Sequence, residues 1–226
     1  HTLHPNVELM ICLETSPFED LSKGEQIYDG YHSTNRVTYT QSWKDNSLEY
    51  IEKTNAENVS IWMWYCISGS KGWEKYPWVQ GNTITRNLAQ FEKMGMSEIF
   101  FDSFGEPLDL RWPLFYACCK GMYDGETDAE TLLYDTCCLL YGAAADDMFL
   151  YYRSLADAAL EHPGRLISVT WVPDEVGQIY GEDHAQIDAL MKRALSKLEY
   201  LTDEQRQRVL VQSAYWDTVA EKMDDV

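Results

Sequence analysis

The sequence predicts an α/β protein, in which parallel βα units come first and a helical region follows. Over the first half of the 226 residues, short apolar runs alternate with segments of helical periodicity, as in parallel strands joined by crossover helices. After about Leu110 the patterns are almost entirely helical. Two capping boxes, "TDAE" at 127–130 and "TDEQ" at 202–205, mark the beginnings of helices in that second half.

Three apolar runs predict the strands. They are "VELMICL" at 7–13, "VSIWMWY" at 59–65 and "SEIFFDSFG" at 97–105, whose apolar part leads into Asp102. Helices are expected over about 43–55 and 83–95, and Gly95 is a suitable C-terminal cap for the second. Because each helix lies between two strands, we expect parallel strands with right-handed crossovers.

The second half predicts helices from the first capping box to Gly142, then over 143–162, about 184–200 and 206–223. Two domains are therefore expected, residues 1–122 with the βα units and residues 123–226 as a helical C-terminal domain. Three βα units are too few to close a (β/α)8 barrel, which takes about 250 residues. The first domain is then either the last part of such a barrel or an open sheet completed by other strands.

Charge and motifs exclude several functions. A net charge of −19, from 37 acidic and 18 basic residues, makes nucleic acid and anionic membranes poor partners. No apolar run approaches the roughly 18 residues of a membrane span. The six cysteines and five histidines lack metal-ligand spacing, and no phosphate-binding, dinucleotide or nucleophile-elbow motif occurs. No metal or other cofactor is therefore expected.

Two further expectations concern cysteines and location. The adjacent pairs Cys118–Cys119 and Cys137–Cys138 fall in helical runs, where cysteine usually behaves as a small buried hydrophobe. The chain starts at His1, with neither Met nor a signal-peptide pattern, so it is expected to lack its front part. Localisation stays open between cytoplasmic and secreted.

The order of several landmarks resembles the C-terminal part of a bacterial glycoside-hydrolase-like family, catalogued as domain of unknown function 4838. The landmarks are the strand that opens with "HPNVEL", "VSIWMWYCISG" followed by Pro77, a helix ending at 93–95, "SEIFFDSFG", and the run from "LFYACC" to the Tyr-Gly-Ala-Ala junction at 141–144. The resemblance covers about residues 5–160. It implies the terminal βα units of a (β/α)8 barrel similar to that of α-glucuronidases and β-hexosaminidases, with upstream sequence supplying the remainder. It also implies a carbohydrate substrate and its hydrolysis.

Candidate site residues follow from where the strands end, because ligands of such barrels meet the carboxyl ends of the strands. Glycosidases use paired carboxyl groups, so Asp102 and Glu14 are predicted to be catalytic. Aromatic rings pack against the apolar C–H faces of sugars. The predicted substrate contacts are Trp64, Tyr65, Trp73, Trp78 and the loop carboxylate Glu106. Each of these residues has a structural role as its alternative, and core packing is expected for Trp62.

The predicted function is that of a carbohydrate-active protein, part of a glycoside hydrolase that cleaves glycosidic bonds with carboxylates at the barrel mouth. Its expected partner is an oligo- or polysaccharide. Two other classes remain open: a non-catalytic carbohydrate-binding module, and a helical scaffold or interaction domain in which every tryptophan is packing.

Overall fold

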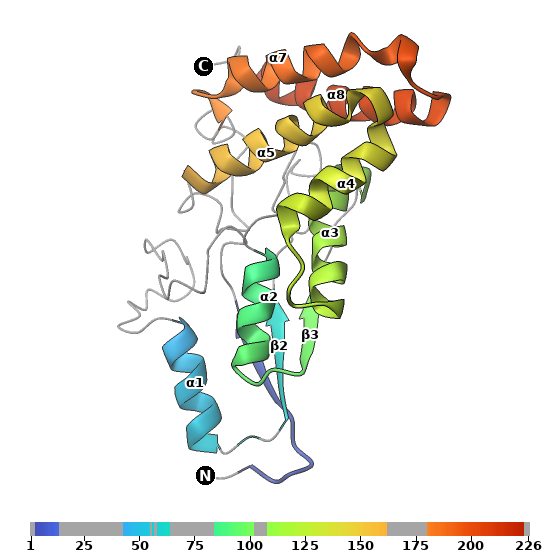
Figure 1. Ribbon diagram of the computed structural model, residues 1–226. Coiled ribbons are helices and arrows are strands. Elements are labelled where there is room, and N and C mark those ends of the chain that lie inside the picture. The colour runs from blue at the N-terminus through green and yellow to red at the C-terminus, as the bar shows by residue number, and fades with distance from the viewer. Residues whose placement is uncertain are drawn as a thin grey trace.

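The computed structural model describes residues 3–13, 43–54, 56, 58–63, 84–101, 108–161 and 180–223, and the fold given below is that of these residues. They form a small parallel sheet, helices against one of its faces, and a group of longer helices toward which the strands point (Figure 1).

The sheet holds three parallel strands in the order β1-β2-β3, with bounds β1 Leu9–Leu13, β2 Val59–Met63 and β3 Glu98–Phe101. Leu9 pairs with Val59, and Ser60 pairs with Glu98. Two helices provide the crossovers, α1 Trp43–Thr54 before β2 and α2 Ile84–Lys93 before β3. The predicted parallel strands and the helices between them are confirmed.

The prediction that these strands are the terminal units of a (β/α)8 barrel is wrong. The described chain is mostly helical, and the sheet that it contains has three strands in sequence order. The inner face of a barrel is filled by side chains from all of its strands. Here Met10, Trp62 and Phe100 are 48%, 38% and 52% exposed on the sheet face that the helices leave open. The described residues therefore form an open sheet followed by helices.

The second half is helical from Leu108 onward, as predicted from about Leu110. Its helices are α3 Leu108–Tyr123, α4 Ala129–Tyr141, α5 Ala145–Glu161, α7 His184–Leu195 and α8 Asp203–Met223, with short 3₁₀ turns at Gly142–Ala144 and Leu198–Tyr200. Pro113 lies in the second turn of α3 and has no N–H to donate to the carbonyl of Asp109, four residues earlier. That carbonyl instead accepts a hydrogen bond from Gln212 Nε2 of α8 at 2.7 Å.

Caps fix where these helices begin and end. At the end of α2, Gly95 has φ of 84°, and the amides of Gly95 and Met96 donate to the carbonyls of Glu92 and Phe91 at 2.9 and 3.0 Å. This pair of bonds is a Schellman motif, so the predicted cap is confirmed. The predicted box before α8 is also confirmed, because Thr202 and Gln205 exchange backbone-to-side-chain bonds.

The other capping box is shifted by one residue. The residue that caps α4 is Asp128, not Thr127, and its carboxylate accepts a hydrogen bond from the Thr131 amide at 2.7 Å. Both residue types are good N-caps, so the sequence "TDAE" offered two neighbouring solutions. The backbone of the α3–α4 connection selects the second.

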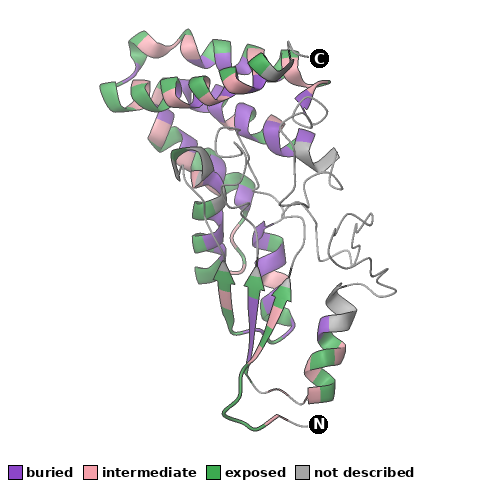
Figure 2. Cartoon of the chain, turned by 180° about the vertical axis from the view of Figure 1, so that it is seen from behind, coloured by how far each residue is buried: buried purple, intermediate pink, exposed green. Residues whose placement is uncertain are grey.

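The buried apolar residues form two clusters (Figure 2). The sheet core joins one face of the strands to α2 and α3 and holds Val59, Ile61, Ile84, Leu88, Phe91, Met94, Met96, Ala117 and Cys118. The helical core lies among α4, α5, α7 and α8 and includes Tyr141, Met148, Tyr151, Tyr152, Leu155, Met191 and Trp216. Helix α3 joins the two, since Ala117 belongs to the sheet core and Trp112 packs against the helical core.

The adjacent cysteines divide between interior and surface. Cys118 and Cys137 are fully buried, whereas their neighbours Cys119 and Cys138 are exposed, and these four cysteines are not disulfide-bonded. The expectation of buried cysteine therefore holds for one residue of each pair. Within the described ranges, no helix is both long and apolar enough to span a bilayer, and no cluster of His, Cys, Asp or Glu has the arrangement of a metal site.

Candidate functional site

The carboxyl ends of the three strands lie side by side. Leu13 pairs with Met63, and Met63 pairs with Phe101, at the last described positions of β1, β2 and β3. Neighbouring strands are about 4.8 Å apart, so Leu13 and Phe101 lie about 10 Å apart across the edge. The residues that follow these positions in the sequence are Glu14, Trp64 and Asp102.

All of the predicted site residues lie outside the described residues, and their assigned roles stay predictions. They are Glu14, Trp64, Tyr65, Trp73, Trp78, Asp102 and Glu106. Glu14, Trp64 and Asp102 follow directly in the sequence after the last described residues of β1, β2 and β3.

The open face of the sheet carries an exposed aromatic pair that leads to this edge. Trp62 and Phe100 are neighbours on β2 and β3, and their ring centroids are 5.6 Å apart in an edge-to-face arrangement. Cys12 on β1 and Met10 are exposed on the same face. This surface is mainly apolar, with the exposed carboxylate of Glu98 at its amino end, and it ends at the residues that precede Trp64 and Asp102.

The prediction that Trp62 packs in the core is wrong. Side chains alternate between the two faces of a strand, so Trp62 lies opposite Ile61, which is fully buried against the helices. One signal was present in the sequence. Glu98 stands two residues before Phe100 and is exposed, so a charged side chain already marked this face of β3 as reaching solvent.

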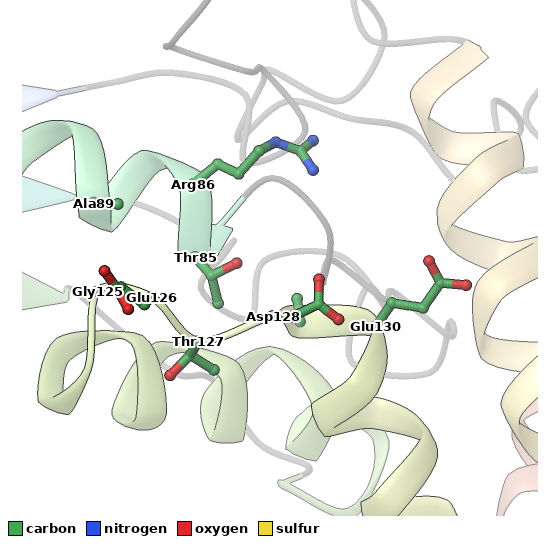
Figure 3. A pocket seen from close by; sticks show the side chains of 9 residues that line it. Thr85, Arg86, Ala89, Gly125, Glu126, Thr127, Asp128 and Glu130 are labelled. Atoms are coloured by element: carbon green, nitrogen blue, oxygen red, sulfur yellow. The ribbon is translucent and has the colours of Figure 1, made fainter.

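A polar pocket of about 310 Å³ lies where α2 and α4 begin (Figure 3). Thr85, Arg86 and Ala89 line it from α2, and residues 125–130 line it from the α3–α4 connection and the first turn of α4. Hydroxyl, guanidinium and carboxylate groups together suit a polar, hydroxylated ligand. Sequence reasoning missed this pocket, because its two walls are about 40 residues apart in the chain.

Two of the pocket's carboxylates already have structural partners. Asp128 caps α4, and the hydrogen bonds from Thr131, aided by the nearby charge of Arg86, lower its pKa. Glu130 pairs with Arg153 of α5, at 3.1 Å between Oε1 and Nη1. Asp128 stays ionised near neutral pH, so its carboxylate can accept hydrogen bonds but is a poor proton donor.

Asp157 of α5, which shares Arg153 with Glu130 of this pocket, is a carboxyl group whose pKa is raised, in contrast to that of Asp128. Burial raises the pKa of Asp157, Arg153 at 3.7 Å opposes this, and the charges of Glu130 and Asp183 add to the rise. Asp157 therefore keeps its proton to a higher pH than an ordinary aspartate. Its pairing with Arg153 four residues earlier is the i,i+4 pattern of a solvated helix face, which is why the sequence did not single it out.

No protein-family model, curated protein or solved structure matches the chain. The resemblance described from the sequence therefore stays a prediction, and function has to be argued from the geometry of this chain.

Proposed function

We propose that the chain is part of a carbohydrate-active protein that hydrolyses glycosidic bonds, with Glu14 and Asp102 as the acid/base pair at the carboxyl edge of the sheet. The observation that carries the proposal is that three parallel strands end in register directly before Glu14, Trp64 and Asp102. Ligands of open α/β sheets bind outside the carboxyl ends of the strands, so this edge is where a substrate is expected.

The separation of the two outer strands favours hydrolysis with inversion. Carboxyl groups about 6.5–9.5 Å apart leave room for a water molecule, whereas about 5–5.5 Å suits a covalent intermediate. The backbones of the two outer strands are about 10 Å apart, which is nearer to the wider separation than to the narrower one. In that reaction one carboxyl group protonates the leaving oxygen as its bond to the anomeric carbon breaks. The other takes a proton from the attacking water.

The exposed aromatic pair on the open face of the sheet supports sugar binding independently of catalysis. Trp62 and Phe100 present aromatic rings to solvent two residues before Trp64 and Asp102. Such rings pack against the C–H faces of pyranoses. This observation favours the second candidate function, a carbohydrate-binding module without catalysis, and the two are distinguished by experiment.

The test of hydrolysis compares carboxyl groups at opposite ends of the same strands. Asp102→Asn and Glu14→Gln are expected to lower turnover of an oligosaccharide substrate by about 10²-fold or more, the usual contribution of acid/base catalysis. Glu98→Gln and Glu8→Gln are the matched controls, because these exposed residues stand at the amino ends of β3 and β1. The controls should keep full activity, and product analysis by NMR should show inversion.

Unchanged turnover in both edge variants would overturn the proposed pair. Loss of turnover in Asp157→Asn alone would instead assign the chemistry to the pocket beside α4. A panel of oligosaccharides that bind but are never cleaved would select the binding module. In that case Trp62→Ala and Phe100→Ala should weaken binding at least about tenfold, whereas Tyr200→Ala, at a 71% exposed tyrosine far along the chain, should not.

A further inference from the structure

The polar pocket where α2 and α4 begin contains a hydroxyl without a partner, on a nearly buried side chain. Thr85, in the first turn of α2, is 4% exposed and lines this pocket. No group in the described part of the chain hydrogen-bonds to the Thr85 hydroxyl, and it is not among the unpartnered atoms that are closed off from solvent. A ligand in the pocket can therefore reach a hydroxyl that is able both to donate and to accept a hydrogen bond.

The direction of the Thr85 side chain follows from the packing of α2 against α3. A Cβ at Gly121 of α3 would lie 3.4 Å from Cγ2 of Thr85, so the methyl group faces α3. The hydroxyl projects from the same carbon atom in another direction, and Figure 3 shows it on the side of Asp128 and α4. The contact between the two helices therefore orients the hydroxyl toward the pocket.

Asp128 and Arg86 supply the groups that complement this hydroxyl. The Asp128 carboxylate accepts from the Thr131 amide at 2.7 Å, and a carboxylate has about four acceptor positions, so it can accept from a ligand as well. Arg86 lines the same pocket with a guanidinium, which only donates. Neighbouring hydroxyls of a sugar can donate to the carboxylate and accept from Thr85 and Arg86 at the same time.

The charges of the lining favour an uncharged ligand. Glu126, Asp128 and Glu130 are carboxylates, and Glu130 is already paired with Arg153. These carboxylates repel an anion, whereas Arg86 opposes a cation. The pocket volume of about 310 Å³ is at the lower end of the usual range of ligand pockets, about 300–1,000 Å³, so it suits one sugar unit.

The pocket lies at the same end of the sheet as the proposed active edge. After α2 ends, the Ser97 amide donates to the carbonyl of Val59 at 3.0 Å, so the end of α2 is close to the amino end of β2. A crossover helix runs back along the strands, so α2 begins toward their carboxyl ends (Figure 1). A glycan at the sheet edge is therefore on the side of the molecule where this pocket lies.

We propose that this pocket binds one uncharged sugar unit through Thr85 and Asp128, as a subsite for the glycan whose hydrolysis is proposed at the sheet edge. The hydroxyls of the sugar donate to the Asp128 carboxylate and accept from Thr85 and Arg86. In its choice of ligand, this inference rests on the proposed carbohydrate function.

Direct binding is the first test, and it needs no turnover. Glucose, galactose, mannose and xylose are each titrated into the whole chain, and the amide signals of Ala89 and Ala129, which line the pocket, are followed by NMR. At least one of these sugars is expected to shift both signals. Glucuronate is expected to bind at least about tenfold more weakly than that sugar, because the carboxylates of the lining repel it.

Three results of these titrations would overturn the proposal. The first is the absence of any shift with the four uncharged sugars. The second is binding of glucuronate as tightly as that of an uncharged sugar. The third is binding of glucosamine more than about tenfold more tightly than any uncharged sugar, which would make the pocket a cation site.

Two conservative variants test the named groups. Thr85→Val keeps the shape of the side chain and removes a hydroxyl that has no partner among the described residues, so folding should not depend on it. Asp128→Asn removes the charge and keeps the cap of α4, because asparagine is an equally good N-cap. Each is expected to weaken sugar binding about fivefold or more, the loss of one hydrogen bond. Thr218→Val and Asp135→Asn, outside the pocket, are the matched controls and should leave the affinity unchanged.

Kinetics with an oligosaccharide substrate separate this proposal from the proposed hydrolysis. Thr85→Val is expected to raise KM about fivefold with kcat unchanged, because its hydroxyl binds substrate and transition state equally. An unchanged KM in Thr85→Val, with turnover lost in Asp102→Asn, would overturn the subsite and leave the hydrolysis. Sugar binding that depends on Thr85 in a protein without turnover would support the sugar site and overturn the hydrolysis.

Discussion

Tyr151 and Tyr152 are neighbours on α5 that are equally buried but have different hydrogen bonding. The Tyr152 hydroxyl is shared with Tyr141 and accepts from Trp112. The Tyr151 hydroxyl has no partner among the described residues, although its ring packs edge-to-face on Trp216 at 6.0 Å. Burial raises the pKa of both phenols well above the ordinary value, so both stay neutral.

This difference predicts opposite effects for one chemical change. Tyr152→Phe is expected to lower the free energy of unfolding by about 1–2 kcal/mol, since it removes bonds from a buried network. Tyr151→Phe is expected to be neutral or slightly stabilising, because it removes an unpaired buried hydroxyl. Urea unfolding of the two variants measures both values. Equal losses would show that the Tyr151 hydroxyl has a partner in solution.

Asp147, at the start of α5, is a nearly buried carboxylate between two cations of the α7 region. It lies 2.8 Å from Arg193 Nε and 2.7 Å from Lys197 Nζ. Burial by itself raises the pKa of Asp147, but the bonds and charges of Lys197 and Arg193 outweigh it, and the net pKa is lowered. Asp147 therefore stabilises the folded protein at pH values where its carboxylate is ionised in both the folded and the unfolded state.

The sign of that shift gives a pH prediction. The unfolded pKa of an aspartate is about 3.9, so the stabilisation is fully present above about pH 4 and is lost as the pH falls through the lower folded pKa. Asp147→Asn is expected to be less stable than the unaltered protein at pH 7, by about 1–3 kcal/mol. This difference in free energy of unfolding should become smaller below pH 4.

The measurement is urea unfolding between about pH 2.5 and 7. Asp146→Asn is the matched control, because this neighbouring aspartate is exposed and accepts a hydrogen bond from Tyr134. The two ion pairs would make no net contribution to stability if the difference in free energy of unfolding between Asp147→Asn and the unaltered protein did not change with pH.

At the scale of elements, the end of α4 packs against the beginning of α8. Gly142 follows α4 with φ of 51°, and a Cβ there would lie 2.7 Å from Oε1 of Gln205. Gln205 is the residue that completes the cap of α8 with Thr202. The absence of a side chain at Gly142 therefore leaves room for the cap of another helix.

Gly142→Ala is expected to lower the free energy of unfolding by about 1–3 kcal/mol, because alanine is strained at this positive φ and its Cβ displaces the cap of α8. Gly125→Ala is its matched control. There a Cβ would lie 2.7 Å from Oε2 of Glu92, the exposed end of a flexible side chain that can move away, so a change below about 0.5 kcal/mol is expected. Thermal unfolding compares the two, and equal losses would contradict the role given to the cap.

For the whole molecule, the buried residues form two clusters, so we expect the region around the sheet core and the region around the helical core to unfold locally and independently of each other. Leu88 belongs to the sheet core and Leu155 to the helical core, and the two leucines are 3% and 0% exposed. Substitution of either leucine by alanine is expected to lower the free energy of unfolding by about 2–5 kcal/mol. Leu88→Ala should lower the hydrogen-exchange protection of β2 and α2 and leave α5 and α8 protected.

Leu155→Ala is the reciprocal variant and should have its largest effect on α5, α7 and α8. Mass spectrometry of exchange, resolved by peptide, distinguishes these patterns. A uniform loss of protection in both variants would show that α3, which contacts both cores, joins them into one cooperative unit.

The sequence by itself determined the local features of this protein. Strand runs, the helices between them, the Gly95 cap and the Thr202 box follow from side-chain periodicity and from bonds between residues a few positions apart. The candidate edge site is of the same kind, since Glu14, Trp64 and Asp102 were singled out by their place after apolar runs. Their arrangement relative to a substrate stays a prediction.

Only the tertiary structure decided what lies against these elements. An apolar run has the same alternation whether one face or both are covered, so the exposure of Trp62 and the open sheet were not predictable from it. Gln212 of α8 donates a hydrogen bond to the carbonyl of Asp109 of α3, which is 103 positions away in the sequence. Contacts over such distances depend on the packing of whole helices, and the sequence near each residue carries no signal for them.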